Sequence, residues 1–191
     1  VGYDSRNGFV YVADQQSNTV TVISSTSVVA TVPVGSGPTD VAFNSENGYV
    51  YVANIFGNTV SVINGTRVVA TVGVGNSPDA VAVNSRNGHV YVANDISGNV
   101  SVIRGTAVVA SVQVAFDLRG ITYDSGSGFA YVTSSSANTV SVINETTVVA
   151  TIPVGLAPEG IGYDSGNGYV YVANYWSNNV SVVSGTRVVA T

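Results

Sequence analysis

The chain has 191 residues, of which 45% are hydrophobic and only 9% are charged. Eleven residues are acidic, the six basic residues are all arginine, and the formal net charge is −5. This balance argues against nucleic acid as a partner, because phosphate binding needs clustered basic side chains. The lack of cysteine excludes disulfides and thiolate metal ligands. No apolar run approaches the roughly 20 residues that cross a bilayer, so we predict no direct membrane insertion.

One sequence unit repeats along the chain without insertions, as the evenly spaced equivalent positions Val1, Val41, Val81, Ile121 and Ile161 show. The units cover residues 1–40, 41–80, 81–120, 121–160 and 161–191. A fixed period of roughly 40 residues is typical of solenoids, propellers and arrays.

Each unit contains four segments with strand character. In the second unit they cover residues 41–43, 48–54, 59–63 and 68–74, which are rich in valine, isoleucine and tyrosine. No window places apolar residues at helical spacing, and residues that favour helices are scarce. The sequence therefore predicts an all-β chain.

Short turns join the strands of a unit. The turn between the first two strands begins with Asp or Asn and ends with glycine in every unit, at Gly8, Gly48, Gly88, Gly128 and Gly168. An Asp or Asn side chain caps such a turn, and glycine accepts the positive φ of a tight hairpin. Consecutive strands joined in this way form an antiparallel meander.

A four-stranded meander that recurs in every unit predicts one β-propeller blade per unit. The segment 49–53 is apolar on both of its faces, as expected for a strand packed between two neighbouring blades. We therefore predict a single β-propeller domain over residues 1–191 with five four-stranded antiparallel blades. The alternative is a five-blade portion of a larger propeller, such as one with seven blades.

Closure of the propeller is a separate question. The second residue of the first strand is glycine or alanine in four of the five units, at Gly2, Ala42, Ala82 and Gly162, and is Thr122 in the fourth unit. Small residues suit inner strands crowded around a narrow axis. They favour a closed ring of five blades, in which residues 1–13 contact residues 163–182.

The second strands carry a recurring motif: Tyr11-Val-Ala-Asp14, Tyr51-Val-Ala-Asn54, Tyr91-Val-Ala-Asn94, Tyr131-Val-Thr-Ser134 and Tyr171-Val-Ala-Asn174. With the valine-rich strands that follow, this pattern resembles the YVTN-repeat β-propeller family over the whole chain. The resemblance implies a propeller common in surface-layer and other cell-surface proteins of archaea, and in secreted or periplasmic bacterial proteins. Its members often have seven blades, whereas five units are present here.

Two sets of connections meet at one end of a meander: the loops between second and third strands, and the links between units. Aromatic side chains in such loops are unusual, because loops generally run exposed over the surface. We predict a recognition face for a protein or a surface glycan, with Phe56, Phe116, Tyr175, Trp176, Asp40, Asp79, Arg119 and Glu159. The alternative is that these aromatic rings cover neighbouring loops or contact flanking domains.

The other polar residues that could carry chemistry are better explained by structural roles. His89, the only histidine, occupies a position that is aromatic in the other units, so we predict a packing role. Carboxylates near the channel mouth could act as acid and base or bind a hard cation, but they lack a regular ligand spacing. We predict no catalytic residue, metal or cofactor. Asn54, Asn94 and Asn174 are predicted turn caps.

Asn64-Gly-Thr66 and Asn144-Glu-Thr146 match the N-glycosylation pattern in equivalent turns, so Asn64 and Asn144 are candidate glycosylation sites.

These observations favour an extracellular or cell-surface structural and adhesive module without enzymatic activity, which mediates protein or glycan interactions. Two alternatives remain. One is a ligand-binding propeller of a secreted or periplasmic protein, and the other is a lyase-type propeller enzyme.

Overall fold

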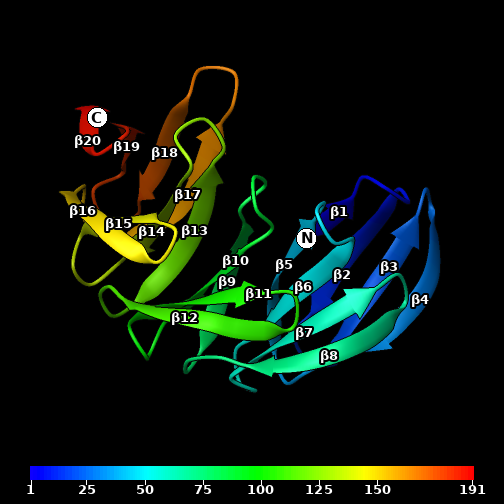
Figure 1. The fold of residues 1–191 in the computed structure, drawn as a ribbon. Coiled ribbons are helices and arrows are strands. Elements are labelled where there is room, and N and C mark those ends of the chain that lie inside the picture. The colour runs from blue at the N-terminus through cyan, green and yellow to red at the C-terminus, as the bar shows by residue number, and fades with distance from the viewer.

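The computed structural model describes all 191 residues, and it contains twenty β-strands and no helix (Figure 1). The first unit forms β1 (Gly2–Asp4), β2 (Phe9–Asp14), β3 (Thr19–Ser24) and β4 (Ser27–Pro33). The second forms β5 (Pro38–Asn44), β6 (Tyr49–Asn54), β7 (Thr59–Asn64) and β8 (Arg67–Gly73). The third forms β9 (Pro78–Val83), β10 (Val90–Asn94), β11 (Asn99–Arg104) and β12 (Ala107–Gln113). The fourth forms β13 (Leu118–Asp124), β14 (Phe129–Ser134), β15 (Thr139–Asn144) and β16 (Thr147–Pro153). The fifth forms β17 (Pro158–Asp164), β18 (Tyr169–Asn174), β19 (Asn179–Ser184) and β20 (Arg187–Ala190).

Each unit is one antiparallel sheet whose four strands lie in chain order, so the prediction of five four-stranded blades is confirmed. The first strands of the later blades begin earlier than predicted. For example, β5 begins at Pro38, where a register shift lets Pro38 pair with Asn54 and Asp40 pair with Ala53. The first strands β1, β5, β9, β13 and β17 pack against one another in sequence, and the fourth strands lie at the periphery.

The hairpin glycines have the predicted backbone conformation. The φ angle is +75° at Gly8, +78° at Gly48 and +87° at Gly128, with similar values in the other two blades. The amide of each glycine donates to the carbonyl of the Asp or Asn that opens the turn, as Gly48 does to Asn44 over 2.8 Å. The turn pattern read from the sequence is therefore confirmed.

Apolar side chains between consecutive blades form the core. Tyr11, Val20 and Val22 of the first blade meet Val50 and Val52 of the second in one buried cluster. The same positions recur between later blades, which explains why the second strands are apolar on both faces.

A tyrosine hydroxyl adds a polar link at most of these interfaces. Tyr11 donates to the carbonyl of Gly65 over 3.0 Å, and Tyr51 to that of Gly105 over 2.8 Å. Tyr131 donates likewise to Gly185. Each link joins a second strand to the turn between the third and fourth strands of the next blade.

The burial of these tyrosine side chains predicts that the protein unfolds at alkaline pH. Burial raises the pKa of Tyr91 from its ordinary value of 10.0 to about 12, and it also raises the pKa of Tyr11, Tyr51 and Tyr131. Because the folded protein holds these protons more tightly, their stabilisation is complete below about pH 10. We expect it to be lost as the pH rises through the folded pKa values, with unfolding and ionisation occurring together. Tyrosinate absorbance and far-UV circular dichroism between pH 8 and 13 measure both processes. Ionisation near pH 10 with the sheets intact would contradict the prediction.

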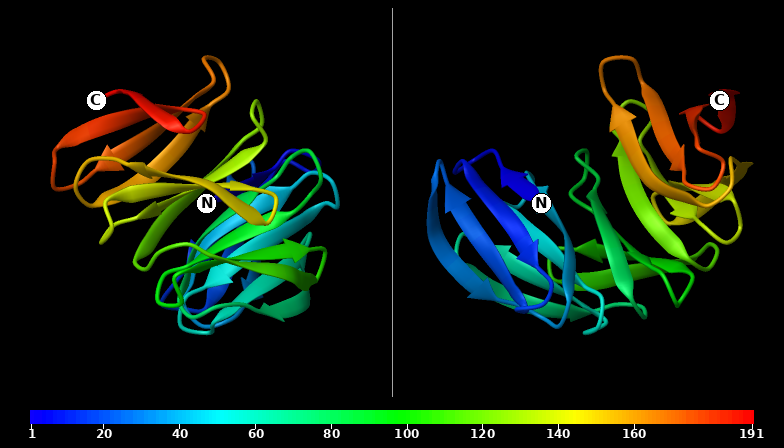
Figure 2. Two further views of the ribbon diagram at one scale, coloured as in Figure 1. Left: turned by 60° about the vertical axis from the view of Figure 1, so that its left-hand side comes forward. Right: turned by 180° about the vertical axis from the view of Figure 1, so that it is seen from behind.

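The five blades form an open arc, and the predicted closed ring is wrong (Figures 1 and 2). In each of the first four blades, one face of the sheet is covered by the next blade. In the last blade the equivalent face is exposed. Val180 is 45% exposed, whereas the equivalent Val60, Val100 and Val140 are fully buried. At the other end Val1 is 75% exposed, whereas the equivalent Val41 is 5% exposed. The arrangement is the alternative predicted above, a five-blade portion of a larger circle.

The small residues of the first strands explain the error. A Cβ atom at Gly2 would lie only 2.8 Å from Cγ1 of Val41, so a small residue allows close contact with the next blade. The equivalent Gly162 lies on the bare face, where a Cβ atom would meet nothing within 4 Å. These residues set the spacing of two neighbouring blades, which does not determine how many blades complete a circle.

Candidate functional site

We call the end of the blades that carries the loops between second and third strands, together with the links between blades, the loop face. The opposite end, with the remaining hairpin turns, is the turn face. Large apolar side chains stand exposed on the loop face: Phe56 is 70% exposed, Phe116 64%, Tyr175 64% and Trp176 72%. They are too exposed to be core residues.

A cleft of about 610 Å³ opens on the loop face between the fourth and fifth blades. Tyr175, Trp176 and Leu156 supply its large apolar side chains, and Arg119 and Glu159 supply charge. The remaining lining residues are Asp117, Ser135, Ser136, Asn138 and Ala157. A volume of this size and a mixed lining of this kind are typical of sites for small molecules or short oligomers.

Backbone hydrogen bonds hold the aromatic loop against the link between the two blades. The amide of Tyr175 donates to the carbonyl of Ala157 over 2.9 Å, and that of Trp176 to Leu156 over 3.2 Å. The amide of Ala157 in turn donates to Oδ1 of Asn138 over 2.8 Å, which leaves the Nδ2 group of Asn138 without a partner in the chain. The cleft is therefore built on anchored loops and offers a free amide donor.

Charge near the cleft is concentrated around Arg119. Its guanidinium lies 2.5 Å from a carboxylate oxygen of Asp117 and 3.7 Å from one of Asp95. Burial raises the pKa of Asp95 and of Asp79, an effect that Arg119 opposes at both carboxyls. Glu159 is exposed and has no ion-pair partner.

The structure brings together four of the eight residues predicted for the recognition face: Arg119, Glu159, Tyr175 and Trp176. The other four lie outside the cleft. The Phe56 ring lies over Gly37, where an added Cβ atom would be 2.5 Å from it, and Phe116 lies in the same way over Gly98.

Asp40 and Asp79 also lie outside the cleft. Asp40 has a structural task, because its carboxylate accepts hydrogen bonds from the amides of Val41 and Val81 and so links the second blade to the third. Asp79 is half-buried beside the ion-paired group around Arg119.

Sequence reasoning did not select Ser135, Ser136 and Asn138 as site residues. They lie in the loop between the second and third strands of the fourth blade, which contains no aromatic residue that would have indicated a binding role. Because the aromatic loop of the fifth blade lies beside the loop of the fourth, the neighbouring loop could have been included on topology alone.

The net charge of the protein lies on one face. The loop face holds six carboxylates, those of Asp14, Asp40, Asp79, Asp95, Asp117 and Glu159, and a single arginine, Arg119. The turn face holds five carboxylates, Asp4, Glu46, Asp124, Glu145 and Asp164, and five arginines, Arg6, Arg67, Arg86, Arg104 and Arg187. The formal side-chain charge is therefore −5 on the loop face and zero on the turn face.

The asparagines at the ends of the second strands are structural. Asn54 is fully buried, and its Nδ2 group donates to Thr59 and Ser61 of the next strand over 3.1 and 3.0 Å. Asn94 and Asn174 make equivalent bonds. They therefore join two strands of a blade, which corrects their prediction as turn caps.

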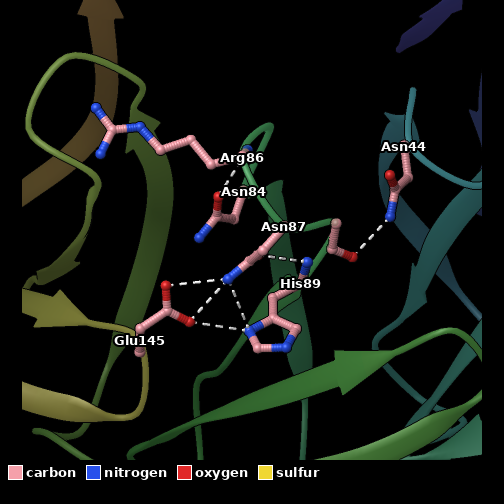
Figure 3. Close-up of polar contacts among 7 residues, drawn as sticks. Asn44, Asn84, Arg86, Asn87, His89 and Glu145 are labelled. Atoms are coloured by element: carbon pink, nitrogen blue, oxygen red, sulfur yellow. Dashed lines mark hydrogen bonds and ion pairs between the residues drawn. The ribbon is translucent and has the colours of Figure 1, made fainter.

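His89 lies on the turn face, at the opposite end from the cleft. Its Nδ1 atom lies 3.1 Å from the carboxylate of Glu145, which also accepts from the Nδ2 group of Asn87 over 2.9 Å (Figure 3). This group bridges the third and fourth blades. The nearby hydroxyl of Tyr91 makes no hydrogen bond, unlike its counterparts in the other interior blades. The histidine is therefore part of a polar contact between blades.

No three histidine, aspartate or glutamate side chains lie close enough together to hold a metal ion. None of the elements is a helix that could cross a membrane. Asn64 and Asn144 are both exposed, on the turn face.

No protein-family model and no curated protein sequence matches the chain. Solved structures do resemble it. A functionally unknown protein from Desulfotomaculum acetoxidans has a TM-score of 0.82 and 18% identity, over 95% of this chain and 65% of its own. Virginiamycin B lyase from Staphylococcus aureus has a TM-score of 0.85 and 14% identity, over 96% and 66%. A streptogramin B lyase structure has a TM-score of 0.78 and 13% identity, over 91% and 60%.

These similarities define the protein by its fold as a β-propeller with five four-stranded blades. The chain spans about two thirds of the length of the structures that it matches. At such low sequence identity the similarity concerns the fold alone, because one fold supports many unrelated functions.

Proposed function

We propose that the chain is a recognition module of a cell-surface or other extracellular protein, and that it binds a glycan in the cleft between its fourth and fifth blades. The observation that carries this proposal is the pair of exposed aromatic residues, Tyr175 and Trp176, beside hydrogen-bonding groups in one cleft. Aromatic rings stack on the apolar faces of sugar rings, while hydroxyl, amide and carboxylate groups bond to sugar hydroxyls.

The extracellular part of the proposal has separate support. The five phased copies of the Tyr-Val-Ala-Asn type motif resemble a repeat that is common in archaeal surface-layer proteins and in secreted bacterial proteins. The candidate glycosylation sites Asn64 and Asn144 lie on the turn face, so glycans attached there would leave the cleft free. A protein segment is the second candidate for the occupant, because exposed aromatic residues also anchor protein interfaces.

We favour binding over catalysis. Two of the similar structures are lyases, but the likeness concerns the fold. The only imidazole, that of His89, lies at the other end of its blade against Glu145. In the cleft, the carboxylate of Asp117 is already paired with the guanidinium of Arg119. Glu159 is the remaining titratable carboxylate of the cleft.

The test is binding by a matched pair of variants. Screening a glycan array with the parent protein identifies a binder, and calorimetry then compares Trp176→Ala with Phe56→Ala. Both side chains are about 70% exposed on the same face, but only Trp176 lines the cleft. We expect Trp176→Ala to weaken binding by at least about tenfold, as for an aromatic anchor, and Phe56→Ala to leave it unchanged. Equal affinity of the two variants for every binder would reject the cleft as the site.

A further inference from the structure

The cleft carries a negative charge that nothing in the chain neutralises. Arg119 is its only cation, and that charge is already matched by Asp117 at 2.5 Å and by Asp95 at 3.7 Å. Glu159, on the side of the cleft formed by the fifth blade, has no such partner. A ligand that enters the cleft therefore meets an unpaired carboxylate and an arginine that is already occupied.

The surrounding surface reinforces this asymmetry. The whole formal side-chain charge of −5 lies on the loop face, while the other five arginines are at the turn face. A surface of one sign around a concave site raises the local concentration of ligands of the opposite sign and repels those of the same sign. The field of the protein therefore favours a cationic ligand at the cleft.

We propose that the cleft selects a glycan that carries a protonated amino group, and that it discriminates against glycans that carry carboxylates. This inference rests on the proposed function. The ammonium group would bind the carboxylate of Glu159 and the faces of Tyr175 and Trp176, since aromatic faces attract cations. The hydroxyls of the sugar would bond to Asn138 and the nearby serines, which offer both donors and acceptors.

Calorimetry at pH 6 with three oligosaccharides of equal length tests the inference. The first is a glucosamine hexamer with free amino groups, the second its neutral N-acetylated counterpart, and the third an anionic galacturonic acid hexamer. We expect the glucosamine hexamer to bind at least about tenfold more tightly than the neutral one, and the anionic hexamer to bind most weakly. Added salt should reduce the preference, because it screens charges at the surface.

Two variants locate the effect. Glu159→Gln should remove most of the preference for the amino sugar, measured as the ratio of the affinities for the glucosamine hexamer and the neutral hexamer. Glu46→Gln, which removes an exposed carboxylate from the turn face, should leave both affinities unchanged. Both changes have the same effect on net charge, so a difference between them identifies the cleft.

The possible failures are distinguishable. Equal binding of all three hexamers, or tighter binding of the neutral or anionic one, would overturn the charge preference and leave glycan binding intact. Binding of a lysine-rich peptide together with no binding of any hexamer would overturn both proposals and point to a protein partner. Equal responses of the Glu159 and Glu46 variants would overturn the role of the cleft in the preference.

Discussion

Replacing Gly35 by alanine is expected to destabilise the protein by about 1–3 kcal/mol, the usual cost of overpacking a close contact. A Cβ atom at Gly35 would lie 2.6 Å from Nδ2 and 2.7 Å from Cγ of Asn54, and 2.9 Å from the hydroxyl oxygen of Thr59. Asn54 is fully buried and is held by Thr59 and Ser61, so it has no room to move away. Urea unfolding followed by circular dichroism measures the loss.

The fourth blade provides the control for this prediction. There Ala115 stands at the position of Gly35, and Ser134 replaces the asparagine, while Thr139 matches Thr59. A shorter side chain makes room for the Cβ atom of the link. The double variant Gly35→Ala, Asn54→Ser reproduces this combination in the second blade. We expect it to be more stable than Gly35→Ala alone. If the single variant were as stable as the parent, or if the second change gave no recovery, the proposed contact would be refuted.

Amide hydrogens of β19 in the last blade are expected to exchange at least about tenfold faster than those of the equivalent strand β15. The comparison is made at residues 182–183 of β19 and the equivalent residues 142–143 of β15, which are paired with a strand on either side; β20 does not reach the first half of β19. The two segments differ in side-chain cover: Val142 is fully buried between two blades, whereas Val182 is half-buried on the bare face. Less buried apolar surface lowers the free energy needed for local opening.

Hydrogen exchange measured by mass spectrometry on peptides from the two strands is the appropriate test. The third strand of the first blade, β3, is an internal control, because its Val20 and Val22 are fully buried against the second blade. We expect β3 to be protected more strongly than β19. Equal exchange in β15 and β19 would show that the last blade does not depend on cover from a neighbour.

The order of the strands could be predicted from the sequence because its physical causes are local. Alternation of valine and tyrosine, together with glycine at the hairpin positions, defines each strand and turn within a few residues. Gly48 with a φ of +78° is one example. Repetition of the sequence unit then repeats the same sheet five times. The charge asymmetry of the two faces also follows from the sequence once the order of the strands is known.

The recognition face could be predicted in part. Tyr175, Trp176, Arg119 and Glu159 were selected because loops and links meet at one end of a blade, and this topology is a property of any meander. Asp40 was selected on the same grounds, but its carboxylate binds the amides of Val41 and Val81. Whether a carboxylate faces solvent or a backbone amide of the next blade depends on how two blades pack, which the spacing of residues along the chain does not specify.

The sequence by itself determined the strands, the turns, the number of blades and the end of each blade that carries the variable loops. Tertiary structure decided whether the blades close into a ring and where a cleft opens. The physical reason is that closure depends on the rotation between neighbouring blades, which accumulates from one interface to the next through side-chain packing such as that of Gly2 against Val41. No short-range sequence pattern specifies the total rotation over all blades. The small residues of the first strands were therefore consistent with a narrow ring and equally with the open arc.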